Sequence, residues 1–391
     1  MTRRLRPYRA LLVAMLLLVA TLQADDAALI YPVQIDGKWG YIDATGELVV
    51  PAVWDAAFDC SEGRCRVRRG ELYGFIDTTG KVLIEPAYPE ARDFHSGRAA
   101  VARTPVFDLD AGDDAALLET DPDVLQWGYI DPAGAWAIPA QFAGAADFQS
   151  ARAAVRDAKA DGLWGYIDTS GKWVSSRRFL AAGPVAPDGV AVVQVDDQGY
   201  QLMRADGNLS EIVFDQLGEW QQGLAPAYRL AQVAAAESLA DRLFAEQSDE
   251  LHTDDKANTL KRGNAATAVD EAIGYGYVDS YGTYVIKPQY ERAFSFSGGL
   301  ARVQIERKFG FIDPQGTVVI EPTYDDAQDF HGDLAAVKDR GFWIYIRPTG
   351  KRAFDRRFDV AGPFRQGIAR VVAFDEVKYI DTTGKTVWPQ D

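Results

Sequence analysis

One phrase recurs along the chain and constrains what the chain can fold into. It opens with an aromatic residue and a glycine, continues as Y-I-D, and closes with a glycine three residues after the aspartate, as in KWGYIDATG and QWGYIDPAG. Successive closing glycines lie 34, 54, 37, 36, 75, 34, 34 and 34 residues apart. A step that keeps returning to the same value predicts a tandem-repeat protein, here with nine copies and two long insertions.

Each phrase reads as a strand, a tight turn and a second strand. The aromatic and β-branched residues of W-G-Y-I-D suit a pleated sheet, and the glycine inside this strand marks a bulge or a close approach of another backbone. In D-x-x-G, the aspartate accepts a hydrogen bond from the backbone two residues on, and the glycine supplies the positive φ that closes the turn. The predicted turn residues are Asp43, Gly46, Asp77, Gly80, Asp131, Gly134, Asp168, Gly171, Asp279, Gly282, Asp313, Gly316, Asp381 and Gly384.

The rest of the unit contains the return strand, which is the second strand, and a third strand. The return strand is ELVVPA (47–52), KVLIEPA (81–87) or TVVIEPT (317–323), and its proline belongs at a sheet edge or a strand end. A turn and a third strand follow, as in ARDFHSGRAAVA (91–102). One such unit buries little surface alone, whereas stacked copies bury a continuous core. We expect an all-β array of about nine three-stranded units, arranged as a propeller-like toroid or as an open β-superhelix.

The repeats resemble the WG-repeat family of bacterial proteins, which is named for the Trp–Gly pair. The resemblance rests on the D-x-x-G turns and on six aromatic–glycine pairs, and it extends over almost the whole mature chain. The pairs are Trp39-Gly40, Tyr73-Gly74, Trp127-Gly128, Trp164-Gly165, Tyr275-Gly276 and Phe309-Gly310. The resemblance implies β-rich repeats, often in exported proteins, that are generally thought to mediate interactions. It implies no defined reaction and no catalytic residue.

The aromatic residues at the WG position have two interpretations. Periodic aromatics in a repeat protein mostly pack against neighbouring units, which makes them a repeat core; the alternative is a ladder that stacks sugars. We favour the core. The predicted repeat-core residues are Trp39, Tyr73, Trp127, Trp164, Tyr275, Phe309 and Trp343. Aromatics outside the consensus, which are freer to contact a ligand, include Trp136, Trp173, Trp220 and Trp388.

The N-terminus reads as a targeting segment. Four arginines precede an apolar run over residues 10–20, which is short for a membrane span, and a small residue, Ala24, follows it. This pattern predicts a signal peptide over residues 1–24, cleaved near Ala24, and a mature protein in the periplasm or outside the cell with no transmembrane segment. The alternative is an uncleaved N-terminal anchor.

Two insertions interrupt the repeats. The acidic segment 104–125 and the longer segment 229–272 both fall between a third strand and the next WG phrase, which places them on one face of the array, often the binding face. Apolar residues recur at helical spacing within 229–247 and predict an amphipathic helix that packs on the array or docks a partner. The second insertion separates repeats 1–5 (25–228) from repeats 6–9 (273–391).

Chemistry-bearing residues are few. Cys60 and Cys65, the two cysteines, either form a structural disulfide or remain spectator thiols. Asp108, Asp110 and Glu119 share the spacing of an EF-hand loop, but the glycine and aspartate between them stand in the wrong order. A solvated acidic loop is therefore the simpler interpretation, and we expect no metal site and no cofactor.

Composition and motifs together favour binding over catalysis. The formal net charge of −16 disfavours a nucleic-acid partner, and the chain has no G-x-S-x-G or H-E-x-x-H motif. We expect an exported, non-catalytic repeat scaffold that binds an unidentified protein or cell-envelope polymer through the insertion-bearing face. The alternative is a carbohydrate-binding or carbohydrate-active protein that uses exposed aromatics and carboxylates such as Glu85 and Glu321.

Overall fold

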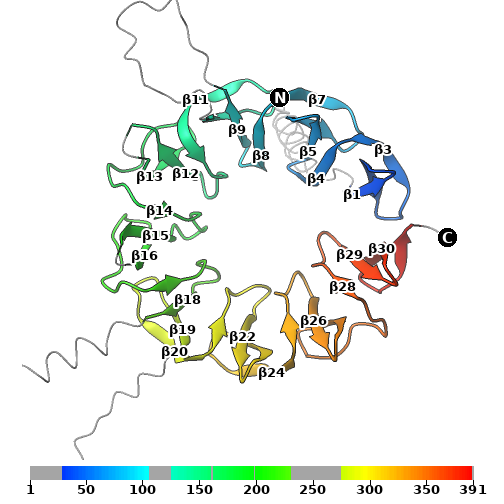
Figure 1. The fold of residues 1–391 in the computed structure, drawn as a ribbon. Coiled ribbons are helices and arrows are strands. Elements are labelled where there is room, and N and C mark those ends of the chain that lie inside the picture. The colour runs from blue at the N-terminus through cyan, green and yellow to red at the C-terminus, as the bar shows by residue number, and fades with distance from the viewer. Residues whose placement is uncertain (1–28, 105–124, 160–161, 198, 230–273, 390–391) are drawn as a thin grey trace, which may run out of the picture. The chain divides into compact units, whose positions relative to one another are not determined.

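The computed structural model describes residues 29–104, 125–159, 162–197, 199–229 and 274–389. The regular secondary structure of these described residues consists entirely of β-strands (Figure 1). The chain divides into two compact units, one of residues 1–148 and 387–391 and the other of residues 149–386. The helix expected within 229–247 lies outside the described residues.

The first unit holds eleven antiparallel strands. They are β1 Ile30–Ile35, β2 Lys38–Asp43, β3 Leu48–Trp54, β4 Ala56–Ser61, β5 Arg64–Arg69, β6 Leu72–Asp77, β7 Val82–Tyr88, β8 Glu90–His95, β9 Arg98–Arg103, β10 Gln126–Ile130 and β11 Trp136–Ala145. Consecutive strands pair with one another, giving the sheets β1-β2-β3 and β4-β5-β6-β7 and the run from β8 to β11. Consecutive antiparallel order is that of a propeller blade.

The remaining strands repeat the same pattern and are mostly shorter, and all lie in the second unit except the last two residues of β31. They are β12 Arg152–Asp157, β13 Trp164–Asp168, β14 Ala181–Ala182, β15 Ala191–Asp196, β16 Gly199–Met203, β17 Gln216–Leu217, β18 Ala225–Tyr228, β19 Tyr275–Val278, β20 Tyr284–Tyr290, β21 Arg292–Ala293, β22 Ala301–Ile305, β23 Lys308–Ile312, β24 Val318–Tyr324, β25 Asp326–Ala327, β26 Ala335–Asp339, β27 Phe342–Ile346, β28 Val360–Ala361, β29 Ile368–Ala373, β30 Glu376–Asp381 and β31 Thr386–Trp388. The sheets are β14-β15-β16, β17-β18-β19-β20, β21-β22-β23-β24, β25-β26-β27 and β28-β29-β30-β31.

The expectation of about nine three-stranded units was wrong in its count. The described strands form eight sheets, of three, four or six strands. Two sequence repeats share one six-stranded sheet, β8 to β13, because the ten-residue strand β11 continues past the end of its own repeat. In most of the other sheets, the segment before the predicted third strand forms an additional, fourth strand. This additional strand can be as short as two residues, as in β21.

The WG glycine allows two strands to come unusually close. The register between β23 and β24 shifts on both sides of Phe311, so the strand opposite Gly310 bulges towards it. A Cβ atom at Gly310 would lie 2.5 Å from the carbonyl oxygen of Ile320, and Gly40 and Gly276 face the same obstruction. The predicted bulge with close backbone approach is confirmed. The return strands β3, β7 and β24, with their prolines, are edge strands, as predicted.

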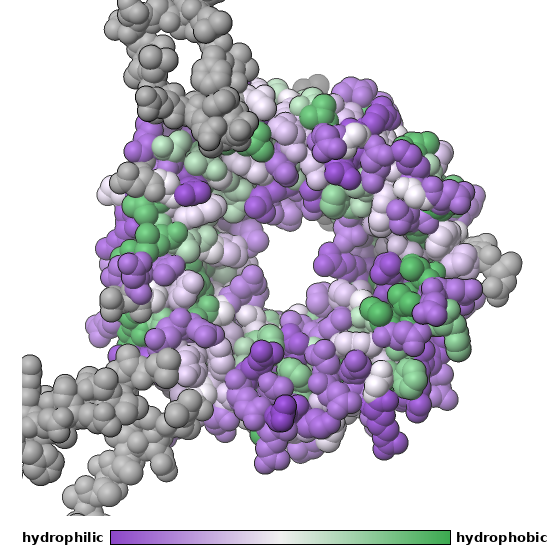
Figure 2. Space-filling model, viewed as in Figure 1, coloured by the Kyte–Doolittle hydropathy of each residue, from purple (hydrophilic) through white to green (hydrophobic). Residues whose placement is uncertain are grey.

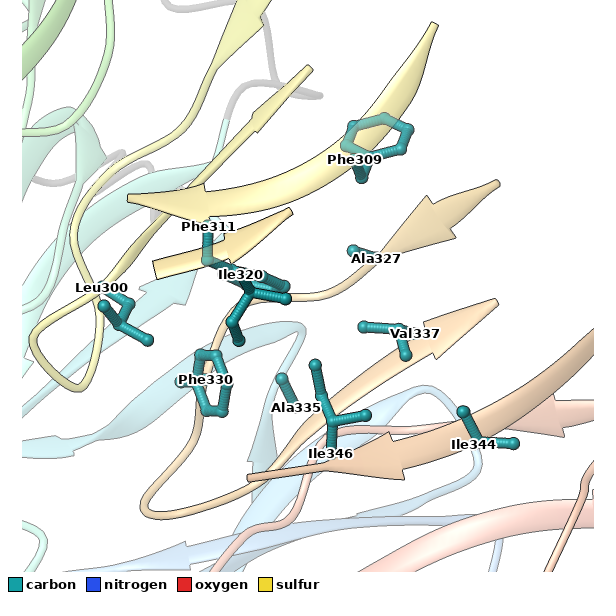
Figure 3. Close-up of a cluster of buried hydrophobic side chains, with 10 residues drawn as sticks. All are labelled: Leu300, Phe309, Phe311, Ile320, Ala327, Phe330, Ala335, Val337, Ile344 and Ile346. Atoms are coloured by element: carbon teal, nitrogen blue, oxygen red, sulfur yellow. The ribbon is translucent and has the colours of Figure 1, made fainter. Parts of the chain in front are cut away.

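The core lies between successive sheets. Figure 3 shows one such layer, in which Phe311 and Ile320 from the sheet β21-β22-β23-β24 face Phe330, Val337 and other residues from the sheet that follows. The rings of Phe311 and Phe330 pack edge to face, with their centroids 4.9 Å apart. Equivalent pairs recur along the chain. They are Phe75 with Phe94, Tyr129 with Phe148, Tyr277 with Phe296 and Tyr345 with Phe364.

A buried tyrosine hydroxyl joins many of the sheets to the next one. It belongs to the tyrosine of G-Y-I-D and donates to the backbone carbonyl oxygen 17 residues later. We call this contact the tyrosine staple. The pairs are Tyr41 to Phe58, Tyr129 to Ala146, Tyr166 to Gly183, Tyr277 to Phe294 and Tyr345 to Gly362, at 2.6–2.9 Å. Burial raises the pKa of all five hydroxyls, so they remain protonated donors.

Two sheets carry phenylalanine in place of this tyrosine, and an arginine takes over its role. Arg66, paired across the sheet with Phe75, donates from Nε to Asp93 at 2.8 Å and from a terminal nitrogen to the carbonyl oxygen of Ala91. Its guanidinium lies 3.8 Å from the ring centroid of Phe58. We call this contact the arginine staple.

The arginine staple recurs in the second unit with the same spacing. Arg302, paired with Phe311, donates to Asp329 and to the carbonyl oxygen of Ala327, and its guanidinium lies 3.7 Å from the ring centroid of Phe294. In both cases the carbonyl is 25 residues and the carboxylate 27 residues after the arginine. Repeats with a tyrosine staple have a small residue or proline at the arginine position, such as Ala154 or Pro226.

Candidate functional site

The predicted turn residues all serve the backbone of their own turns. The Asp43 carboxylate accepts hydrogen bonds from the backbone N–H groups of Thr45 and Glu47, and Gly46 has φ of +89°. The carboxylates of Asp77, Asp131, Asp168, Asp279, Asp313 and Asp381 accept the same two bonds. The hydroxyl of Thr45 also donates to Asp43 and, as the main cause, lowers the pKa of that carboxyl group. These carboxylates are occupied as structural acceptors.

The predicted repeat-core aromatics flank the core. Trp39, Tyr73, Trp127, Trp164, Tyr275 and Trp343 are half-buried, and Phe309 is buried. Each lies opposite a second aromatic on the return segment, for example Trp39 opposite Trp54 and Phe309 opposite Tyr324. The most deeply buried side chain is the aromatic two residues further on, such as Tyr41 or Phe311, which the sequence analysis did not single out. Its signal was the recurrence of Tyr or Phe at that place in every phrase except the one that carries Leu202.

The described histidines and two of the tryptophans outside the consensus make local contacts. His95 and His331 occupy equivalent turns, with Nδ1 at 3.3 and 3.2 Å from a carbonyl oxygen two residues earlier. Trp136 and Trp173 are partly exposed, and an arginine guanidinium lies over each ring. Within the described ranges, no three His, Cys, Asp or Glu side chains are placed to hold a metal ion. The EF-hand-like residues 108–119 lie outside those ranges.

Cys60 and Cys65 form a disulfide. They face each other across the hairpin between β4 and β5, with Cα atoms 4.0 Å apart. Cys65 is fully buried in the core that includes Tyr41 and Val67. The bond therefore joins the two strands of one short hairpin and leaves no free thiol among the described residues.

The hairpins between the third strand and the WG strand form the candidate binding region, which we call the hairpin edge. The insertions leave and rejoin the described chain at these hairpins, after Arg103 and after Arg229. The insertions themselves, over 105–124 and 230–273, lie outside the described residues. Where no insertion is present, the hairpin has two residues, as at Glu306 and Arg307 between β22 and β23.

Carboxylates on the chain entering the sheet hold these hairpins. Asp55 accepts a hydrogen bond from the backbone N–H of Gly70 at 2.7 Å, and Glu291 accepts one from Arg307 at 3.0 Å. In the last sheet, Asp359 accepts the N–H of Phe374 at 2.9 Å. The hairpin tips are therefore fixed to the sheets, and a side chain at a tip is presented in a defined direction.

Phe374 stands out at the hairpin edge. It is 91% exposed although it is a large apolar residue. Its φ is +56°, in the left-handed region, which costs a residue with a Cβ about 1–2 kcal/mol. The equivalent positions Glu306 and Arg340 have φ of +49° and +51°, so this backbone belongs to the two-residue turn, and the exposed ring is what sets Phe374 apart. Phe374 is therefore the residue at this edge that local folding explains least.

Phe374 is part of a group of exposed apolar side chains, which we call the Phe374 patch. The group comprises Phe342, Val360, Phe374 and Val377. Val360 and Val377 lie in one row across the sheet because each pairs with Val372. Phe342 belongs to the preceding sheet, and the guanidinium of Arg357, two residues before Asp359, lies over its ring at 5.9 Å. Figure 2 shows how such apolar groups interrupt a mainly hydrophilic surface.

Charged residues border the Phe374 patch. Arg340, at the hairpin of the preceding sheet, and Asp375 and Glu376, beside Phe374 in its own hairpin, are all exposed. An apolar group with a polar rim is the usual composition of a protein interaction site. Val377 stands where other repeats have the WG aromatic, so the patch coincides with a departure from the repeat consensus.

Sequence comparison assigns the chain to a family. A model of the WG containing repeat matches seven segments that together cover more than half of the chain. The chain belongs to the WG containing repeat family. The matched segments are 39–73, 73–102, 127–157, 164–198, 275–309, 309–343 and 345–372. The phrase ending at Gly207, in which arginine replaces the turn aspartate, lies outside them, as does the last phrase.

Solved structures resemble this WG-repeat protein in fold. A crystal structure of the eukaryotic initiation factor aligns with a TM-score of 0.55 and 10% identity over 92% of this chain and 94% of that chain. At this identity the likeness shows the fold alone. Apo AztD from Citrobacter koseri aligns with 12% identity over 92% of this chain and 93% of that chain. Its TM-score of 0.37 is too low to support a shared fold. No curated protein matches the sequence.

The described residues of the WG-repeat protein contain no helix with the length and apolar character needed to cross a membrane.

Proposed function

We propose that this WG-repeat protein is an exported, non-catalytic scaffold that binds a protein or a cell-envelope polymer through its hairpin edge. The observation that carries the proposal is Phe374, an almost fully exposed aromatic residue held at the tip of a hairpin with a left-handed backbone. A large apolar side chain in water is unfavourable by itself, and burying it in an interface contributes about 2–3 kcal/mol. Aromatic residues of this kind are frequent hot spots of binding.

Two further features support the proposal. The insertions are attached to hairpins equivalent to the one that carries Phe374, so the variable parts of the chain and the Phe374 patch belong to the same region of their repeats. The Cys60–Cys65 disulfide suits an oxidising compartment, as an exported protein would meet. The turn carboxylates, which would be the natural candidates for acid–base chemistry, are engaged in backbone hydrogen bonds, which supports a binding role.

The test compares three forms of the mature chain, residues 25–391, immobilised and exposed to cell-envelope extract. The forms are wild type, Phe374→Asp and Tyr281→Asp. Tyr281 is a matched control because it is 65% exposed but lies in a D-x-x-G turn instead of at the hairpin edge. We expect one partner, identified by mass spectrometry or sugar analysis, to be retained by wild type and Tyr281→Asp and lost by Phe374→Asp. Equal capture by all three forms would overturn the proposal.

The role of the longer insertion is tested separately. A fourth form replaces residues 229–272 with a short Gly/Ser linker. Loss of the partner in this form, as in Phe374→Asp, assigns both segments to one contact surface. Retention of the partner limits the contact surface to the hairpins of the sheets themselves.

A further inference from the structure

One seam between sheets in the second unit has neither type of staple. It lies between the sheets β14-β15-β16 and β17-β18-β19-β20. Leu202 occupies the place of the stapling tyrosine, and Val192, its partner across the strands, occupies the place of the stapling arginine. Neither side chain has a hydrogen-bonding group. The seam is joined instead by Trp220, whose Nε1 donates to the Asp188 carboxylate at 2.8 Å.

A groove of about 530 Å³ lies at this seam. Its size falls in the range of ligand-binding sites. Its lining includes Pro184, Val192, Tyr200, Leu217 and Glu219, and it therefore combines an apolar wall, an aromatic ring and a carboxylate.

The groove keeps the two acceptors and one of the two rings that surround each stapling arginine, and Pro184 stands where the closer ring, Phe58 or Phe294, stands at the other seams. Leu217 follows Val192 by the same 25 residues that separate Ala91 from Arg66, and Glu219 follows it by the same 27 residues that separate Asp93 from Arg66. Tyr200 stands at the WG position, as do the two rings, Tyr73 and Phe309, that lie 5.6 and 5.7 Å from a stapling guanidinium. Arg66 and Arg302 thus show twice that this pair of acceptors holds a guanidinium.

The acceptor in the groove is unused. The carboxylates of Asp93 and Asp329 each bind a guanidinium, whereas the exposed carboxylate of Glu219 accepts no hydrogen bond from the described part of the chain. The backbone carbonyl of Glu219 is the only part of that residue with a partner there, the hydroxyl of Ser295 at 2.9 Å.

We propose that this groove binds an arginine side chain of a partner polypeptide. The guanidinium would ion-pair with Glu219 and donate to the backbone at Leu217, as the stapling arginines do with the equivalent acceptors, and it would lie beside the Tyr200 ring. Lysine lacks the planar fork that makes these contacts together. The net charge of −16 attracts a cationic partner, and Pro184, Ala186 and Pro187 extend the groove beyond the space one side chain fills. The groove shares no residue with the Phe374 patch, so the two proposals stand separately.

Isothermal titration with short peptides tests the proposal. The probe is acetyl-Gly-Gly-Arg-Gly-Gly-amide, and the matched peptide replaces arginine with citrulline, which has the same shape without the charge. We expect the citrulline peptide to bind at least tenfold more weakly. Glu219→Gln should weaken binding of the arginine peptide about tenfold, because it removes a charge-assisted hydrogen bond. Equal binding of both peptides, or no effect of Glu219→Gln, would overturn the proposal.

Val192→Arg provides an internal test. By analogy with Arg66 and Arg302, the new side chain should fill the groove from within, raise the melting temperature and abolish peptide binding, while the control Val192→Ala retains binding. Unchanged peptide affinity in a folded Val192→Arg protein would contradict the proposal. If that variant does not fold, the citrulline and Glu219→Gln comparisons still decide.

Two further arms identify the source of the guanidinium. Free L-arginine should bind at least tenfold more weakly than the peptide; equal affinity would assign the groove to a small molecule and overturn the polypeptide partner. The chain's own insertion carries Arg242 and Arg262. If the peptide binds only after both are changed to alanine, an arginine of the chain itself occupies the groove, and the partner proposal is wrong.

Discussion

The hydroxyl of Tyr345 lies 2.6 Å from the carbonyl oxygen of Gly362, and this bond joins the sheet β25-β26-β27 to the sheet that follows it. The same bond recurs at four other tyrosines with the same spacing, and at two seams an arginine replaces it. The sheets are therefore joined by directed polar contacts in addition to the apolar layers between them.

Removing the Tyr345 hydroxyl should destabilise the protein measurably. Tyr345→Phe preserves the ring contacts but leaves the buried carbonyl group of Gly362 without its donor. We expect the free energy of unfolding to fall by about 1–2 kcal/mol, measured by denaturant titration. Tyr281→Phe, at an exposed ring, should change it by less than about 0.5 kcal/mol. Equal effects of the two substitutions would show that the staple contributes nothing.

Removing the Arg302 guanidinium should destabilise the protein to a similar degree. Arg302→Gln removes the ion pair with Asp329, the bond to Ala327 and the contact with the Phe294 ring. Because the arginine side chain is only 15% exposed, we expect a loss of about 2 kcal/mol. The matched control is Arg340→Gln, whose side chain is 90% exposed and whose ion pair with Asp339 is long, so its effect should be near zero.

The WG glycine should tolerate no side chain. In Gly310→Ala, the new Cβ would lie 2.5 Å from the carbonyl oxygen of Ile320, and backbone cannot move aside as a flexible side chain can. We expect a loss of about 3 kcal/mol in the free energy of unfolding. Gly341→Ala has open space around the new atom but a φ of +87°, so backbone strain alone should cost about 1 kcal/mol. A smaller loss at Gly310 than at Gly341 would contradict this explanation.

The turn carboxylates should make stability fall in acid. The pKa of Asp43 is lowered, first by the Thr45 hydroxyl and then by backbone N–H groups. The unfolded chain, with an aspartate pKa of about 3.9, therefore takes up protons before the folded chain does as the pH falls. The stabilisation is present above about pH 4 and is lost below it.

Melting temperatures measured between pH 5 and pH 2.5 test this prediction. Asp43→Asn keeps an acceptor oxygen but cannot titrate, so its melting temperature should fall less steeply with acid than that of wild type. Thr45→Val, which removes the hydroxyl donor, should shift the dependence in the same direction. Parallel curves for all three proteins would show that this carboxyl group is not responsible.

The sequence predicted the parts of the fold that depend on local residue chemistry. The D-x-x-G turns and the bulge at the WG glycine each need a particular residue at a particular place, so the pattern exposes them. The number of sheets could not be read in this way. It depends on β11, which continues through Ala145 and takes part in a second repeat, and on two-residue strands such as β25 that lack any periodic signal.

The staples and the candidate sites were also beyond the sequence. Alternation places Trp39 and Tyr41 on one face of a strand, but it does not say that the tyrosine hydroxyl bonds to the backbone of the neighbouring sheet. The role of Arg66 becomes visible only when Ala91 and Asp93 are seen beside it. Phe374 gave no signal because exposure and backbone strain at a hairpin tip are properties of the folded chain.

The most direct test of the binding role is site-specific photo-crosslinking at the hairpin edge. A photoreactive phenylalanine analogue at position 374 preserves the aromatic character of Phe374, and the same analogue at position 281 serves as the control. After irradiation in cell-envelope extract, the proposed scaffold predicts one discrete crosslinked species from position 374 and none from position 281. The same products from both positions, or none from position 374, would contradict a contact surface at the hairpin edge.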